Sequence, residues 1–213
     1  MLAELASTTA PRTPQVPPAV YPPRKRWTRE ECRTLEATGL WDRERLELIE
    51  GDLLTRMSKK RPHVIAFVLM AEWLNEVFGV LFVNPESPID VAPHDNPTSE
   101  PEPDFAVLAK AATEYTTSNP GPRLSSGNDI RLVIEISDST LAFDLGPKAR
   151  LYARAGIADY WVVDLENRRL HIHRDPQDGA YATVTTHDET QTLTPLTAPA
   201  ATLTVNAVLP PRA

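Results

Sequence analysis

The chain has 213 residues and a single cysteine, with 41% hydrophobic and 24% charged side chains, which is the composition of a globular protein of about one domain. One cysteine excludes an intramolecular disulfide and a cysteine-clustered zinc site, and the lack of an apolar run of roughly 18 residues or of a signal-like start predicts a cytoplasmic protein without membrane contact. The formal net charge of −7 excludes a globally basic surface, so contact with nucleic acid requires a local patch.

In chain order, the first predicted segment is a disordered tail over residues 1–26, where six prolines break any helix. Thr28 followed by Glu31 then matches a helix capping box. Apolar residues on either side of residues 50–52 indicate a β-hairpin, and a 3.6-residue apolar repeat indicates a long helix after it. The elements predicted in this half are a helix over 28–35, a hairpin over 45–57 and a helix over 63–78.

The second half of the chain is rich in short apolar runs and predicts mainly strands. One helix, opened by Pro147 and ending at Ala155, lies between them. The predicted strands are 80–83, 89–91, 104–108, 131–136, 159–164, 169–174 and 181–186. This order predicts an α/β fold over residues 27–190, with a mixed β-sheet flanked by helices. Residues 191–213 form a Thr-, Pro- and Ala-rich extension with one candidate strand at 201–205.

Glu135 is the polar residue that is hardest to explain by packing. It lies between Ile134 and Ile136 in the most strand-like run of the sequence, and a buried carboxylate is costly unless it is paired, protonated or bound to a cation. Strand alternation places its side chain on the face of Val133 and Ser137. We interpret Glu135 as a functional acid; the alternative is an edge strand whose other face is wet.

Asp104 is the second candidate acid, because it opens a strand directly after Pro103, and proline holds a strand entrance extended. Glu102 lies two residues earlier and would share its side of the chain. On strands next to each other, Asp104 and Glu135 would form a pair suited to Mg²⁺ or Mn²⁺, since Mg²⁺ is commonly bound by one or two carboxylates, waters and a substrate phosphate.

Lys148 is the third candidate. The sequence places it in the first turn of a helix that begins at Pro147, where the helix dipole disfavours a lysine. Such a position would suit an ammonium group that faces carboxylates, a phosphate or an activated water. The alternative is a simple ion pair with Asp144, four residues earlier. Tyr152, one turn further along, would share the face of Lys148.

Four segments in the same order resemble the Uma-type restriction endonuclease family, which belongs to the PD-(D/E)XK nuclease-like superfamily. The resemblance extends from about residue 28 to residue 174, which is most of the predicted folded chain. The four segments are ELIEGD at 47–52, PDFAV at 103–107, LVIEIS at 132–137 and DLGPKARLYARAGIADYWVVD at 144–164.

The resemblance implies a restriction-endonuclease-like fold with Asp104 and Glu135 as the ligands of Mg²⁺ or Mn²⁺. Ser137 stands where a standard site of the superfamily has a lysine, so the resemblance implies a lysine displaced onto the next helix as Lys148. It also implies an auxiliary acid from the hairpin and leaves open which one. The auxiliary candidates are Glu47 or Glu50 in the hairpin, together with Glu102, Ser137, Asp144 and Tyr152.

The expected activity is metal-assisted hydrolysis of phosphodiester bonds, with Lys148 positioning a water or neutralising charge in the transition state. We expect nucleic acid, DNA before RNA, as the partner, and the resemblance implies a homodimer. Two alternatives stay open, a catalytically silent binding protein of the same fold and a metal-dependent phosphohydrolase for a small substrate. A narrow enclosed pocket would favour the small substrate, whereas a rim of Lys and Arg would favour nucleic acid.

Overall fold

The computed structural model describes residues 23–39, 44–56, 58–114 and 129–212, and most of the predicted tail over 1–26 lies outside them. The helices are α1 (Arg29–Glu36), α2 (Arg61–Phe78), α3 (Leu141–Phe143) and α4 (Ala149–Arg154), and the π-helical turn η4 (Asp144–Lys148) joins α3 to α4. The strands are β1 (Leu46–Ile49), β2 (Asp52–Thr55), β3 (Val83–Pro85), β4 (Phe105–Leu108), β5 (Ile130–Ser137), β6 (Asp159–Asp164), β7 (Arg169–Gln177), β8 (Ala180–Asp188), β9 (Thr192–Leu193) and β10 (Leu203–Thr204). The 3₁₀ turns are η1 (Val80–Phe82), η2 (Asn96–Thr98), η3 (Ala112–Glu114) and η5 (Val205–Val208).

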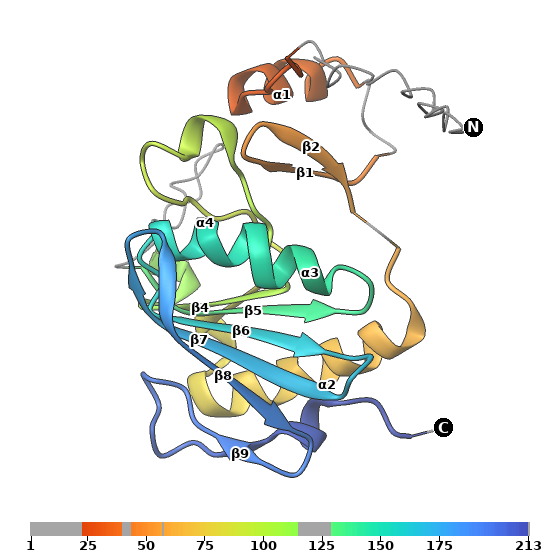
Figure 1. Ribbon diagram of the computed structural model, residues 1–213, viewed down its shortest axis with the longest axis vertical. Helices are drawn as coiled ribbons and strands as arrows, with labels where there is room; N and C mark the ends of the chain where they lie inside the picture. Colours follow the sequence, from red (N-terminus) through yellow and green to blue (C-terminus); the bar gives the residue numbers. More distant parts are fainter. Residues whose placement is uncertain (1–22, 40–43, 57, 115–128, 213) are drawn as a thin grey trace, which may run out of the picture.

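A six-stranded sheet in the order β3-β4-β5-β6-β7-β8 forms the centre of the fold. Strands β5 and β6 are parallel, and the other neighbouring pairs of this sheet are antiparallel. A parallel pair needs a crossover connection, which α3, η4 and α4 supply. Figure 1 shows this helical segment on one face of the sheet and α2 on the other. The predicted α/β fold, a mixed sheet flanked by helices, is confirmed.

The three elements predicted before the sheet are also confirmed. At the start of α1, the Glu31 amide donates to the Thr28 hydroxyl at 3.2 Å and the Thr28 amide donates to the Glu31 carboxylate at 3.0 Å, which is a complete capping box. Strands β1 and β2 pair as an antiparallel hairpin. Helix α2 ends at Gly79, whose φ of 88° suits a residue without a side chain.

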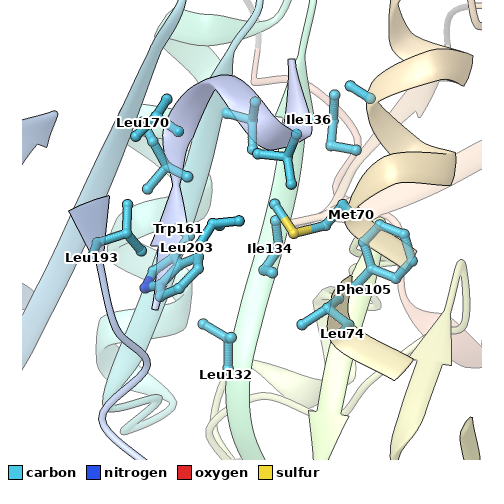
Figure 2. Close-up of a cluster of buried hydrophobic side chains, with 14 of the residues drawn as sticks. Met70, Leu74, Phe105, Leu132, Ile134, Ile136, Trp161, Leu170, Leu193 and Leu203 are labelled. Carbon is cyan, nitrogen blue, oxygen red and sulfur yellow. The ribbon is translucent and has the colours of Figure 1, made fainter. Parts of the chain in front are cut away.

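One hydrophobic core lies between the sheet and α2 (Figure 2). Met70 of α2 belongs to the same buried cluster as Ile134 of β5 and Trp161 of β6, and each such side chain contributes roughly 1.5–3 kcal/mol on burial. Within the described ranges, no helix is long and apolar enough to cross a membrane. After β8 the chain returns to this core and adds Leu193, Leu203, Val205, Val208 and Leu209. The core therefore continues through the segment that the sequence indicated as an extension, and the candidate strand at 201–205 is observed as β10.

A second core lies on the opposite face of the sheet, under α4. It includes Leu151 and Tyr152 of α4 together with Val133 of β5. Because side chains alternate along a strand, Glu135 shares the face of Val133, whereas Ile134 faces α2. The interpretation of β5 as an edge strand is wrong, since β4 and β6 pair with it on either side.

The strand predicted at 89–91 is wrong, because these residues form irregular backbone. The Val91 amide donates to the side-chain oxygen of Asn96 at 2.8 Å, and the guanidinium of Arg29, which is 7% exposed, donates to the Ile89 carbonyl oxygen at 3.5 Å. Side chains thus satisfy backbone groups that a strand would have satisfied through a ladder, and an apolar run alone does not reveal such partners.

Two further boundaries differ from the prediction. Residues 80–82 form η1, so the strand expected at 80–83 begins only at Val83. The crossover helix begins at Leu141 and contains Pro147. Proline has no N–H to donate and clashes with the preceding turn of an α-helix, and the wider π-helical turn η4 accommodates it. Lys148 therefore lies inside a helical segment and not in its first turn.

His173 of β7 gives the fold a dependence on pH. It is 5% exposed and lies against Tyr160 and Tyr181, with ring centroids 5.3 and 5.6 Å away. Burial lowers the pKa of His173, the neighbouring His171 adds to this effect, and together they bring the pKa to about 4. In the unfolded chain the pKa of histidine is about 6.5, so the unfolded state binds more protons between these values, and stability falls as the pH falls through this window.

We expect the free energy of unfolding to decrease by about 2 kcal/mol more between pH 7.5 and pH 5 in the wild type than in His173→Phe, which keeps an aromatic ring but cannot titrate. Urea unfolding at both pH values measures this difference. His94→Gln, at a side chain that is 70% exposed, is the control and should leave the pH dependence of the wild type in place. An equal pH dependence in His173→Phe and the wild type would contradict the assignment.

Candidate functional site

Two buried carboxylates lie on neighbouring strands at the same end of the sheet. Phe105 of β4 pairs with Ile134 of β5, so continuing this antiparallel register by one residue places Asp104 opposite Glu135, with both side chains on one face. Each of the two acids is 5% exposed, and both line a cavity of about 270 Å³. The sequence prediction that these acids lie side by side therefore agrees with their positions in the fold.

Asp104 is held by groups from three directions. Its Oδ1 accepts from Lys59 Nζ at 2.9 Å, its Oδ2 accepts from the Ile136 amide at 2.8 Å, and His63 Nε2 lies 3.4 Å from Oδ2. Burial alone would raise the pKa of Asp104, but the contacts with His63, Lys59 and the Ile136 amide outweigh it and lower the pKa to about 2. Asp104 is therefore ionised over the whole physiological pH range.

Glu135 has a more enclosed environment. Its Oε1 accepts from Lys148 Nζ at 2.9 Å and from the Tyr152 hydroxyl at 2.8 Å. Burial raises the pKa of Glu135, attraction to Lys148 offsets part of this rise, and the charges of nearby acids such as Asp144 and Asp104 add to it, so that the pKa is about 8. The two acids of the pair thus differ in protonation near pH 7. Shifted pKa values of this kind are common in functional sites.

Lys148 lies between two carboxylates, with its Nζ 2.9 Å from Glu47 Oε1 and 2.9 Å from Glu135 Oε1. Burial would lower the pKa of this lysine, but the two carboxylates outweigh burial and raise it, so the ammonium stays charged. The alternative of a simple pair with Asp144 is therefore too narrow: the ammonium contacts Glu47 and Glu135, while Asp144 accepts a hydrogen bond from the Thr140 hydroxyl at 2.6 Å and acts on Lys148 through its charge.

The two hairpin glutamates have different positions. Glu47 is 7% exposed, lines the cavity and also accepts from the Glu102 amide at 2.9 Å. Glu50 lies in the hairpin turn, where its carboxylate pairs with Arg154 at 2.6 Å. Among the described residues that line the cavity, Glu47 is the one glutamate from the hairpin, so Glu50 as the auxiliary acid is not supported.

The other auxiliary candidates lie around this centre. Ser137 is buried, and its hydroxyl is 3.3 Å from that of Thr140, which in turn donates to Asp144. Tyr152 contacts Glu135 directly, as described above. Glu102 is turned toward Arg56 at the margin of the site, where the two side chains form an ion pair. Ser137 and Asp144 therefore support the helix start, and Tyr152 supports the acid.

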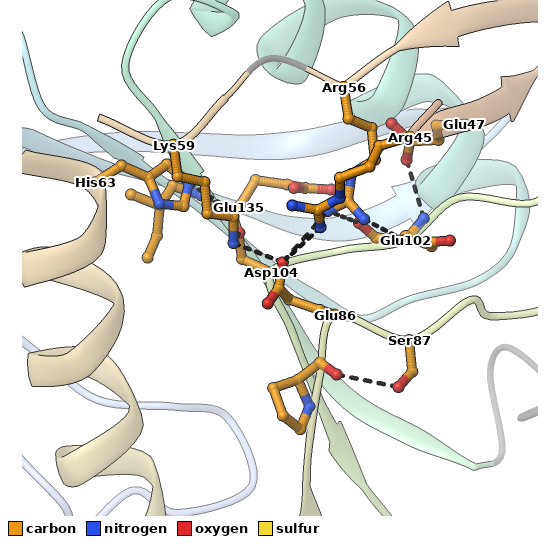
Figure 3. A network of polar contacts seen from close by, with 12 residues as sticks. Arg45, Glu47, Arg56, Lys59, His63, Glu86, Ser87, Glu102, Asp104 and Glu135 are labelled. Carbon is orange, nitrogen blue, oxygen red and sulfur yellow. Dashed lines mark hydrogen bonds and ion pairs between the residues drawn. The ribbon is translucent and has the colours of Figure 1, made fainter. Parts of the chain in front are cut away.

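Several basic residues at the site were not singled out from the sequence. They surround the cavity from the hairpin and from the start of α2, and Figure 3 shows most of them next to Asp104. These residues are Arg45, Arg56, Lys59, Lys60 and His63. A signal was present, since basic residues recur between the hairpin and the long helix. In a chain of net charge −7, these residues gather cations beside Asp104, and most of the cations are paired with acids such as Glu86, Glu102 and Asp138.

The carboxylates of the cavity form a small donor set for a divalent cation. In the described part of the chain, no group of three or more His, Cys, Asp or Glu side chains is arranged to hold a metal ion. Mg²⁺, however, is usually bound by one or two carboxylates, with waters and phosphate oxygens completing its shell. Asp104 and Glu135 fit this pattern of ligands, and the cavity that they line has room for waters beside them.

The buried pair of Lys148 and Glu135 yields a stability prediction. Lys148→Met leaves two buried acids without their cation, and we expect a loss of about 3 kcal/mol in the free energy of unfolding. Adding Glu135→Gln should make the combined loss smaller than the sum of the single losses by at least about 1 kcal/mol. Denaturant unfolding of the four proteins measures this coupling.

The matched control for that cycle is Lys60→Met, because Lys60 is 66% exposed and pairs with Asp138 at 3.2 Å. An exposed ion pair contributes at most about 1 kcal/mol. The proposed dependence of Glu135 on Lys148 is wrong if Lys148→Met lowers the free energy of unfolding no more than Lys60→Met does. It is also wrong if the losses in Lys148→Met and Glu135→Gln are additive.

The chain is similar to a known protein family and to a solved structure. A profile of the Uma2 family, described as "Putative restriction endonuclease", matches residues 30–206. No curated protein sequence is significantly similar to the chain. One similar solved structure is titled "Crystal structure of a putative nuclease belonging to DUF820 from Anabaena variabilis ATCC 29413"; the TM-score is 0.57 at 15% identity, over 76% of this chain and 88% of that chain.

At 15% identity the structural likeness concerns the fold, and it agrees with the mixed sheet flanked by helices. The family match extends from α1 through β10 and thus includes the hairpin, the two acid-bearing segments and the crossover helix. The chain belongs to the Uma2 family of restriction-endonuclease-like proteins.

Proposed function

We propose that this protein is a divalent-metal-dependent endonuclease that hydrolyses phosphodiester bonds in DNA. The observation that carries the proposal is the pair of buried carboxylates, Asp104 and Glu135, on neighbouring strands in one cavity. The family description supports nucleic acid as the class of substrate. Residues of both charges line the cavity, as a site that binds both a cation and a phosphate requires.

Asp104 and Glu135 would hold Mg²⁺ or Mn²⁺. When bound, the ion would supply an activated water and withdraw charge from the phosphate. Asp104 is suited to this role because its low pKa keeps it ionised. Lys59 and His63 occupy its oxygens in the structure, so these two side chains would have to give up part of their contact with Asp104 to a cation.

Lys148 is proposed as a positioning residue. Its ammonium is shared between Glu47 and Glu135, so its charge is already balanced by neighbouring acids. Together with the Tyr152 hydroxyl, it fixes the orientation of the Glu135 carboxylate. The role of neutralising phosphate charge suits Lys59 better, since Lys59 lies nearer the solvent, with 20% of its side chain exposed, and its Nζ already contacts Asp104.

The rim of the cavity supports nucleic acid over a small substrate. The side chains of Arg45 and Lys60 are 57% and 66% exposed, so their charges can reach a ligand that extends beyond the cavity. A site for a small phosphate ester would have its cations inside the cavity, in contact with an enclosed ligand. Cleavage of both strands of a duplex is easier to explain with two such sites, and for this reason we propose a homodimer as the active form.

Metal binding tests the site without a choice of substrate. We expect calorimetric titration with Mn²⁺ or Mg²⁺ to show binding to the wild type and none to Asp104→Asn/Glu135→Gln. Cleavage of duplex DNA should fall at least about 100-fold in this variant, since even the outer partners of metal ligands cost roughly 10- to 100-fold. Asp138→Asn, which also removes an acid from the cavity lining, is the control and should retain metal binding. Equal binding by the wild type and the double variant would reject the assignment of the ligands.

The raised pKa of Glu135 gives metal binding a pH dependence. Near pH 7 the group of Glu47, Lys148 and Glu135 carries a proton that a carboxylate ligand must lose, because the pKa of Glu135 is raised to about 8. We expect binding of Mn²⁺ to release close to one proton per ion at pH 7 and almost none at pH 9. The apparent affinity should therefore increase as the pH rises to about 8 and level off above it.

Calorimetry in two buffers of different ionisation enthalpy measures the protons released. Glu135→Gln cannot release this proton, so any residual binding by that variant should show no difference between the buffers. Proton release that is the same at pH 7 and pH 9 in the wild type would contradict the raised pKa as the source of the pH dependence.

A further inference from the structure

Three cations converge on one acidic side chain at the mouth of the cavity. Oε1 of Glu86 lies 2.8 Å from Lys59 Nζ, 3.2 Å from Arg45 Nη2 and 3.9 Å from Arg56 Nη2. The cations come from the hairpin and the segment after it, whereas Glu86 follows the edge strand β3. Figure 3 shows these side chains turned toward one another beside Asp104. One carboxylate oxygen thus lies within ion-pair distance of an ammonium group and two guanidinium groups, and the guanidinium of Arg56 also pairs with Glu102.

The backbone of Glu86 is in an unusual conformation that holds this carboxylate in place. Its φ is 45°, in the left-handed region that residues with a side chain seldom occupy. Its amide donates to the Asp104 carbonyl oxygen at 3.1 Å, which fixes Glu86 next to the candidate metal ligand. A conformation of this kind is kept where the surroundings determine it, and such positions are concentrated at functional sites.

The cations around Glu86 adjoin the metal site through a shared lysine. Lys59 Nζ contacts Glu86 Oε1 at 2.8 Å and Asp104 Oδ1 at 2.9 Å, so an anion in the position of the Glu86 carboxylate would be one ammonium group away from Asp104. Arginine forks and a lysine point charge are the groups that bind phosphates in proteins. In a nucleic acid, the phosphates flank one another along the backbone, so a strand with one phosphate at Asp104 would bring another close to these cations.

We propose that Arg45, Arg56 and Lys59 form a subsite for a non-scissile phosphate of the nucleic acid, and that the Glu86 carboxylate occupies this subsite in the free protein and is displaced by the substrate. The proposal rests on the proposed nuclease function for the identity of the ligand. Glu86 then competes with the substrate, because a phosphate that enters the subsite must first break the ion pairs that Glu86 forms with the three cations. The side chains of Glu86 and Arg45 are 35% and 57% exposed, so the exchange needs no opening of the core.

Binding of DNA without metal tests the competition. In the presence of EDTA, fluorescence anisotropy with a labelled DNA duplex should show binding to Glu86→Gln about tenfold tighter than to the wild type, since three partly exposed ion pairs no longer have to be broken. Arg45→Gln in the Glu86→Gln background should remove most of this gain. Glu72→Gln on α2 makes the same change in net charge at an exposed position outside the cavity, and it should change the affinity less than about twofold.

Inorganic phosphate gives a second readout that does not depend on DNA. At a concentration of about 10 mM it should raise the melting temperature of Glu86→Gln about 3 °C more than that of the wild type or Glu72→Gln, because phosphate stabilises the folded state in proportion to its binding. Circular dichroism of each variant without phosphate shows that the fold is intact before either comparison is made.

The outcomes separate this proposal from the nuclease function. Equal behaviour of Glu86→Gln and Glu72→Gln in both assays overturns the subsite, even if the wild type cleaves DNA. Tighter DNA binding by Glu86→Gln supports the subsite, even if no variant cleaves DNA with Mg²⁺ present, and in that case the nuclease function alone is rejected. Stabilisation by phosphate without tighter DNA binding overturns the proposal, because the subsite would then not serve a nucleic acid.

Discussion

The arrangement of the site depends on one buried acid, Glu135, near the end of the central strand β5. An isolated carboxylate at this depth would be neutralised or would destabilise the fold. Lys148 offsets part of this cost through its ion pair with Glu135. The pair can form because the crossover between β5 and β6 passes over the face on which Glu135 lies. The same ammonium binds Glu47 of β1. One cation thus ties the central strand, the crossover helix and the hairpin together, and these three elements line the cavity along with Asp104 and the start of α2.

The electrostatics of the site are local and differ from those of the whole chain. The net charge of −7 describes the field at a distance, and salt screens that field over roughly 8–10 Å. Close to Asp104 a ligand meets the cations of the hairpin and of the start of α2 instead. Many of these cations are paired with acids such as Glu86 and Glu102. While these carboxylates stay in place, the surface has little excess positive charge. This pairing limits the non-specific attraction of the surface to polyanions.

Much of the fold was predictable because its signals are local. The capping box at Thr28, the hairpin and the apolar repeat of α2 each depend on residues close in sequence, and the carboxylate inside β5 is conspicuous in an apolar run. Partners that are distant in sequence were not predictable. The choice between Glu47 and Glu50 depends on strand alternation in a hairpin whose contact with Lys148, about 100 residues later in the chain, no local pattern reveals. Lys59 and His63 were missed for the same reason, since their importance lies in their contact with Asp104.

Residues 193–209 pack into the core between the sheet and α2, and this position has a consequence for synthesis on the ribosome. Leu193, Leu203, Val205 and Leu209 complete the cover over the face to which Trp161 and Leu170 belong. A nascent chain can form the hairpin and α2 early, because these elements are local, but that face stays exposed to water until residues 193–209 have left the ribosome. During this interval the apolar face is open to association with other chains. The time spent in this vulnerable state therefore depends on when residues 193–209 become available, and a chain that lacks them would expose the same apolar face permanently.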